Sequence, residues 1–114
     1  MEDTLIKEIE QKNYVLAVML AQKFGHPENE IRLLKELALK QMACEYRNGI
    51  AARKLAKEWG FSKTELENLL QTALEEYKRA SDKRLLEQVY DTESARYLTL
   101  QRIFQNLFSM FYAQ

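Results

Sequence analysis

Apolar residues recur every three or four positions along most of the chain, which is the spacing of one face of an α-helix. Between residues 28 and 46 this stripe consists of Ile31, Leu34, Leu37, Ala38, Met42 and Tyr46. Between residues 62 and 77 it consists of Leu66, Leu69, Leu70, Ala73 and Tyr77. No stretch alternates apolar and polar residues in the way that predicts a strand. The pattern therefore predicts an all-α fold.

Turn-forming residues divide this pattern into five or six helices. Gly25 and Gly60 each follow an apolar stripe, where a helix commonly ends. Pro27 suits a first helical turn because its missing N–H would have no partner there. Ser62 and Glu65 have the spacing of a capping box. The expected segments are 2–24, either continuous or divided at Asn13, then 27–46, 50–59, 62–77, a piece from 81 or 82 through Val89, and a last helix capped by Asp91–Thr92.

Length and composition indicate one domain that spans residues 1–114. A chain of this length removes roughly 65% of its unfolded surface from water, enough for one core. The sequence is 46% hydrophobic and 30% charged, which is typical of globular proteins. It contains no Pro/Ser-rich linker, low-complexity tract or clear repeat. The expected architecture is a compact bundle of five to six helices.

The charge balance bears on both location and partners. Seventeen basic and 17 acidic residues give a net charge of zero, whereas nucleic-acid-binding domains usually carry a basic excess. Zero net charge also weakens repulsion between copies, which favours a homo-oligomer.

The first helix is charged where a signal peptide needs an apolar run, and Cys44 has no second cysteine to pair with. We expect a reduced, cytoplasmic protein that does not associate with membranes.

The most distinctive local pattern lies between residues 52 and 71. Ala56 is followed four residues later by Gly60 and then by Phe61, and the next segment presents Leu66 and Leu69. Two closely crossing helices need a small residue at the crossing, and a tight turn needs a residue that adopts the left-handed conformation. The pattern resembles the helix-turn-helix motif of bacterial DNA-binding proteins. The same spacing suits a purely structural corner between two helices, and that interpretation stays open.

If the resemblance extends to function, the chain is a DNA-binding transcriptional regulator. Its candidate DNA-binding residues are Arg53, Lys54, Lys57, Ser62, Lys63, Thr64, Glu67 and Asn68, with Gln71 as a further base reader and Arg47 as a further phosphate anchor. An asparagine or glutamine can read adenine. However, residues 62–76 carry one lysine against four glutamates, a net charge of −3 on the helix that would enter the groove. The charge makes DNA binding the second hypothesis.

The C-terminal segment is apolar on nearly every side. Its candidate interface residues are Tyr97, Phe104, Phe108, Met110, Phe111 and Tyr112. Such a helix either occupies the centre of the bundle or has one face covered by another chain. Aromatic residues and methionine are enriched in interface cores. The leading hypothesis is therefore a non-catalytic protein–protein interaction or assembly module.

Residues suited to catalysis are sparse. His26 is the single histidine, which excludes a multi-histidine metal site, and its position before Pro27 is typical of a capping or solvent-exposed residue. Cys44 lies within a helical stripe, where a buried thiol acts as a small apolar residue rather than a nucleophile. Neighbouring glutamates one or two positions apart do not share a helix face. We expect no enzymatic activity, no metal site and no cofactor.

Overall fold

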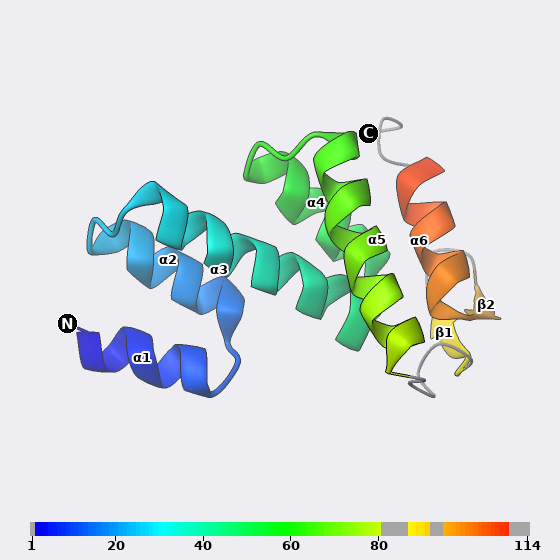
Figure 1. Cartoon of the computed structure of the whole chain (residues 1–114), viewed down its shortest axis with the longest axis horizontal. Coiled ribbons are helices and arrows are strands. Elements are labelled where there is room, and N and C mark those ends of the chain that lie inside the picture. The colour runs from blue at the N-terminus through cyan, green and yellow to red at the C-terminus, as the bar shows by residue number, and fades with distance from the viewer. Residues whose placement is uncertain (1, 81–86, 92–94, 110–114) are drawn as a thin grey trace. The chain divides into compact units, whose positions relative to one another are not determined.

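Helices make up most of the chain, as the sequence predicts. The computed structural model describes residues 2–80, 87–91 and 95–109 (Figure 1). Within these ranges the elements are helical apart from one pair of three-residue strands, which confirms the all-α class. The residues group into two compact units, Met1–Gln41 and Met42–Gln114. The single-domain expectation stays a prediction.

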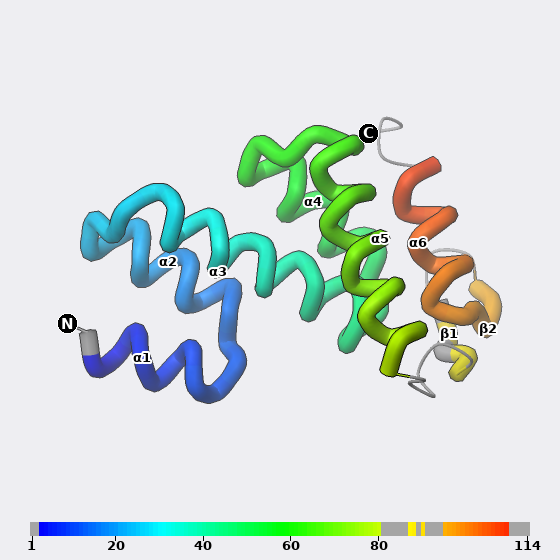
Figure 2. Tube along the Cα trace, in the orientation of Figure 1, coloured from blue at the N-terminus to red at the C-terminus, as the bar shows by residue number. Residues whose placement is uncertain are grey.

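The first unit consists of three helices that run in alternating directions (Figure 2). They are α1 (Glu2–Glu10), α2 (Tyr14–Lys23) and α3 (Glu28–Lys40). Helix α2 packs against both α1 and α3. Its buried face carries Ala17, Val18 and Ala21, and alanines at the contact allow the helix backbones to approach closely.

The chain breaks between α1 and α2, so the divided alternative at Asn13 is the correct one. Lys12 adopts a left-handed conformation with φ of 60°. The Gln41 side chain donates a hydrogen bond of 2.7 Å to the Lys12 carbonyl oxygen, and Gln41 itself is only 7% exposed. Because a buried amide without a partner is costly, this bond satisfies the Gln41 side chain and joins it to the turn.

The turn between α2 and α3 also follows the sequence signals. Gly25 has φ of 71°, and Pro27 stands immediately before the first residue of α3. The ring nitrogen Nδ1 of His26 lies 3.0 Å from Glu30 Oε2 across the first helical turn. His26 therefore contributes to the start of α3, as its position before a proline indicates.

The second unit contains the remaining elements. A π-helical turn, Gln41–Glu45, takes the place of the expected α-helical continuation of α3 to Tyr46. It is followed by α4 (Gly49–Glu58), α5 (Lys63–Arg79), β1 (Val89–Asp91), β2 (Arg96–Leu98) and α6 (Leu100–Ser109). The expected helical piece from 81 or 82 falls largely outside the described residues, and its last residue, Val89, lies in β1 rather than in a helix.

The strand pair corrects the expectation that the last helix begins at Asp91–Thr92. Strands β1 and β2 pair antiparallel with Tyr90 opposite Tyr97, and α6 begins only at Leu100. The two tyrosine rings meet edge to face, with centroids 5.3 Å apart. Aromatic pairs across two strands stabilise a hairpin, and such pairing overrides a capping signal that is only local.

The core of the second unit forms where α6 packs against α4 and α5. The buried stripe of α6 is Leu100, Ile103, Phe104 and Leu107, each at most 3% exposed. Gly49 lies at the contact with α6. A Cβ atom at Gly49 would lie 3.8–3.9 Å from side-chain atoms of Leu107 and Ile103, which is ordinary van der Waals contact.

Two glycines of the second unit should respond oppositely to the same substitution. Gly60 has φ of 78°, so Gly60→Ala should lower the free energy of unfolding by about 1 kcal/mol through backbone strain alone. Gly49→Ala should raise it by about 0.5 kcal/mol, because alanine favours the helix and its methyl group fits against α6. Urea denaturation measures both. Equal destabilisation by the two variants would contradict the space described for a methyl group at Gly49.

Candidate functional site

The segment that resembles a helix-turn-helix motif does form a corner between α4 and α5. Gly60 adopts the left-handed conformation, and the N–H of Phe61 donates to the Ala56 carbonyl at 2.8 Å. Ala56 and Leu66 are fully buried, and Phe61 is 4% exposed. Ala56, Gly60, Phe61 and Leu66 therefore take the packing roles that their spacing predicts, whereas Leu69 is only half-buried.

The capping box at the start of α5 is also confirmed. The Ser62 hydroxyl accepts from the Glu65 N–H at 3.1 Å, and the Glu65 carboxylate accepts from the Ser62 N–H at 2.9 Å. These two bonds satisfy backbone donors that the helix itself cannot pair. Ser62 is thus committed to the fold, and with Glu65 it fixes where α5 begins.

The basic residues that would anchor phosphates are largely engaged within the protein. Arg53 is only 1% exposed. Arg47 is buried and donates to the Glu87 carbonyl oxygen. Lys63 lies 3.8 Å from Glu67 on the next turn of α5. Of the candidate cations, Lys54 is exposed and Lys57 is half-buried. The corner therefore presents little positive surface.

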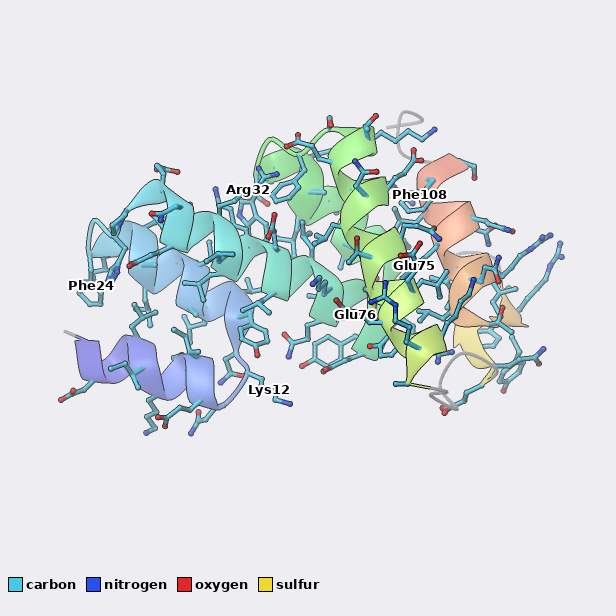
Figure 3. The ribbon with its side chains drawn as sticks, viewed as in Figure 1. Lys12, Phe24, Arg32, Glu75, Glu76 and Phe108 are labelled. Carbon is cyan, nitrogen blue, oxygen red and sulfur yellow. The ribbon has the colours of Figure 1, made fainter. Side chains whose placement is uncertain are left out.

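A groove runs between α5 and α6, and it occupies the face that would read bases. Its volume is about 280 Å³. Helix α5 contributes Glu67, Asn68, Gln71 and Leu74, and α6 contributes Gln101, Phe104, Gln105 and Phe108. Phe108 lies on α6 (Figure 3). Helix α6 borders this face, on which Asn68 and Gln71 remain exposed. Thr64, in the first turn of α5, stays exposed.

The described part of the C-terminal segment divides into three environments. Phe104 is 3% exposed and belongs to the core, and Phe108 is half-buried with its ring centroid 6.3 Å from that of Phe104. Tyr97 lies on β2, whereas the two phenylalanines lie on α6, and it is 67% exposed. The other three candidate interface residues, Met110, Phe111 and Tyr112, lie outside the described residues.

Four primary amides line the groove. The sequence indicated Asn68 and Gln71 as base readers, but it did not indicate Gln101 or Gln105. Asn68 and Gln71 are three positions apart on α5, and Gln101 and Gln105 are four positions apart on α6. Each pair shares a helix face, which is the signal that could have identified it. The side-chain oxygen Oε1 of Gln105 accepts from the Arg102 guanidinium at 3.3 Å. This contact orients one amide of the groove from outside it.

The groove has the chemistry of a binding surface for polypeptide backbone. A primary amide offers two donors and one acceptor, so it can pair with both the N–H and the C=O of an extended chain. Leu74, Phe104 and Phe108 supply an apolar lining between the amides. Of the described residues that line the groove, Glu67 alone carries a charge, and it is near Lys63.

The described ranges of the chain hold no cluster of metal-ligating side chains and no helix suited to span a membrane. In these ranges no three His, Cys, Asp or Glu side chains gather closely enough to hold a metal ion. Cys44 is a buried thiol. None of the helices described is both long enough and apolar enough to cross a membrane.

Comparisons with known proteins give no relative: no family model matches the chain, and neither does any curated protein or solved structure. The function is therefore to be inferred from the chemistry of the groove and of the exposed helix faces.

The helix-turn-helix hypothesis predicts a shallow salt dependence that a titration can check. With Arg47 and Arg53 buried, Lys54, Lys57 and Lys63 limit a monomer to roughly three phosphate contacts. Each contact contributes about −0.9 to the slope of log K against log salt. We expect no measurable binding to mixed-sequence duplex DNA at about 0.15 M salt. Micromolar or tighter binding, with Asn68→Ala costing about 1–3 kcal/mol at one base position, would contradict this expectation.

Proposed function

We propose that the chain is a non-catalytic helical interaction module whose α5–α6 groove binds a short, extended, uncharged segment of a partner protein. The observation that carries the proposal is the combination of an apolar lining with four primary amides in one groove. Apolar side chains give affinity for an apolar side chain of the partner. The amides give a means of holding its backbone.

The amides favour an extended segment over a helix. A helical ligand pairs its own backbone groups and offers a groove only side chains. An extended ligand has unpaired N–H and C=O groups that must find partners when they leave water. Asn68, Gln71, Gln101 and Gln105 offer both donors and acceptors at the groove walls. Main-chain hydrogen bonds of this kind give affinity with little sequence preference.

The size of the groove is compatible with one large side chain of a partner. Small-molecule sites usually enclose about 300–1,000 Å³. At about 280 Å³ the groove lies just below that range and suits one large apolar side chain with its flanking backbone. Leu74, Phe104 and Phe108 would contact that side chain.

The weak charge of the groove favours an uncharged segment over a phosphopeptide or nucleic acid. Glu67 is the one charged lining residue among those described, and Lys63 lies 3.8 Å away. Phosphate recognition uses clustered arginines and lysines. The DNA-binding alternative has less support, because Arg47 and Arg53 are buried. We further propose that the module acts in the cytoplasm, where the buried Cys44 would stay reduced.

The proposal predicts selective binding of a blocked, extended peptide. The probe is a pentapeptide with a central leucine and β-branched neighbours, titrated to millimolar concentration while two-dimensional NMR follows the side-chain amides. We expect the Gln71 and Gln101 amide signals to shift with saturation. Gln71→Ala and Gln101→Ala should each weaken binding about three- to tenfold, the effect of one neutral hydrogen bond.

Two controls make this test specific. Gln22→Ala removes an exposed amide on α2 and should leave the affinity unchanged. The same peptide with a central aspartate should not bind, because the apolar lining cannot solvate a charge. Shifts confined to residues outside the groove, or equal affinity for both peptides, would contradict the proposal.

A further inference from the structure

Helix α3 exposes two leucines on one face. Leu33 is 60% exposed and Leu37 is 40% exposed, and residues four apart lie one above the other on a helix. The buried residues of α3 are Ile31, Leu34, Ala38 and Leu39. A single exposed leucine is common in globular proteins, but two on successive turns of one helix face form a continuous apolar stripe.

Charged residues of opposite sign stand at the two ends of this stripe. Glu30 lies three positions before Leu33, and Lys40 lies three positions after Leu37. At about 100° per residue the four positions fall within about 80° of the helix circumference, so they share one face. The face extends over roughly 15 Å of helix. Glu30 is exposed and Lys40 is half-buried.

The four residues are spaced symmetrically along the helix, so that the face can pair with an antiparallel copy of itself. Position 35 is the midpoint both of Leu33 and Leu37 and of Glu30 and Lys40. When two copies of the helix are placed antiparallel about this midpoint, each Leu33 meets the Leu37 of the other copy. Each Glu30 likewise meets the other copy's Lys40. A two-fold axis makes every such contact twice, as closed dimers require.

We propose that α3 is a self-association surface on which two copies of this chain pair antiparallel, with leucine against leucine and Glu30 against Lys40. The antiparallel arrangement also sets the positive end of each helix dipole beside the negative end of the other. The zero net charge of the chain leaves no general repulsion between copies. The groove between α5 and α6 takes no part in this surface.

The other charged groups near the stripe leave this pairing possible. Glu30 Oε2 lies 3.0 Å from His26 Nδ1, but a carboxylate has about four acceptor sites and can take a second partner. Arg32 and Glu36 contact each other at 3.6 Å on the same helix. The charges of Arg32 and Glu36 therefore neutralise each other. The contact between Glu30 and Lys40 of the other copy then fixes the register of the two helices.

Charge reversal with rescue tests the proposal in the full-length chain by sedimentation equilibrium. The unmodified chain should dimerise with a dissociation constant in the micromolar range, as small interfaces do. Glu30→Lys or Lys40→Glu alone should weaken dimerisation at least about tenfold, because each places like charges together twice. The double variant should restore the dissociation constant to within about threefold, because it re-forms both pairs in reverse.

The rescue separates the interface from helix stability. Lys at the start of α3 and Glu at its end both oppose the helix dipole, so the double variant has the least stable helix. Restored dimerisation in that variant therefore reports contact between copies. Circular dichroism confirms that each variant is folded. A monomeric unmodified chain at millimolar concentration, or a double variant that dimerises no better than the singles, would overturn the proposal.

A matched pair of apolar substitutions identifies the face. Leu33→Asp should abolish dimerisation, because it places two unpaired carboxylates in the contact. Tyr97→Asp alters a residue of similar exposure, 67% against 60%, in the second unit and should leave the dimer unchanged. Loss of the dimer in Tyr97→Asp with its retention in Leu33→Asp would place the contact on the C-terminal segment and overturn the assignment to α3.

Discussion

The burial of one helix face determines the arrangement of the second unit. Leu100, Ile103, Phe104 and Leu107 leave water where α6 packs on α4 and α5, and a fully buried side chain of this size contributes about 1.5–3 kcal/mol. The same packing sets Phe108 and two glutamines beside α5, which creates the groove. Helix α6 also borders the face of α5 that carries the exposed Asn68 and Gln71. The groove that we propose as a peptide site thus follows from the packing of the core.

The corner between α4 and α5 could be predicted because its signals are local. Gly60 supplies a left-handed residue, Ser62 caps the next helix, and Ala56 suits a close crossing, all within seven residues. The burial of Arg53 could not be predicted in this way. Arginine is seldom buried, and no local pattern around Arg53 indicates its 1% exposure. The resemblance to a DNA-binding motif therefore indicated the packing of the corner correctly. It also indicated Arg53 as a phosphate-binding residue, although Arg53 lies inside the protein.

The strand pair and the groove depend on contacts between separated positions. Strands of three residues are too short for a period-two pattern, and Asp91–Thr92 has the composition of a helix cap. The Tyr90–Tyr97 contact, seven residues apart, overrides that signal. The groove joins Gln71 on α5 to Gln101 on α6, thirty residues later. The apolar periodicity predicted both helices, but it could not show that their amide-bearing faces meet.

Taken together, the two proposed surfaces assign different roles to the two units. A dimer formed through α3 would carry two α5–α6 grooves, and a partner with two suitable segments would bind with increased avidity if its linker spans both. Neither surface requires a cofactor or a catalytic group. The exposed leucines of α3 and the amides of the groove are then features of one assembly protein.

The central claim is that the apolar face of α6 is covered within a single chain, and amide hydrogen exchange tests it most directly. The N–H groups of Ile103, Phe104 and Leu107 should exchange with opening free energies close to that of global unfolding. This protection should be the same at micromolar and millimolar protein concentration. Rapid exchange at low concentration, with protection that appears only as the concentration rises, would show that another copy covers this face and would contradict the account.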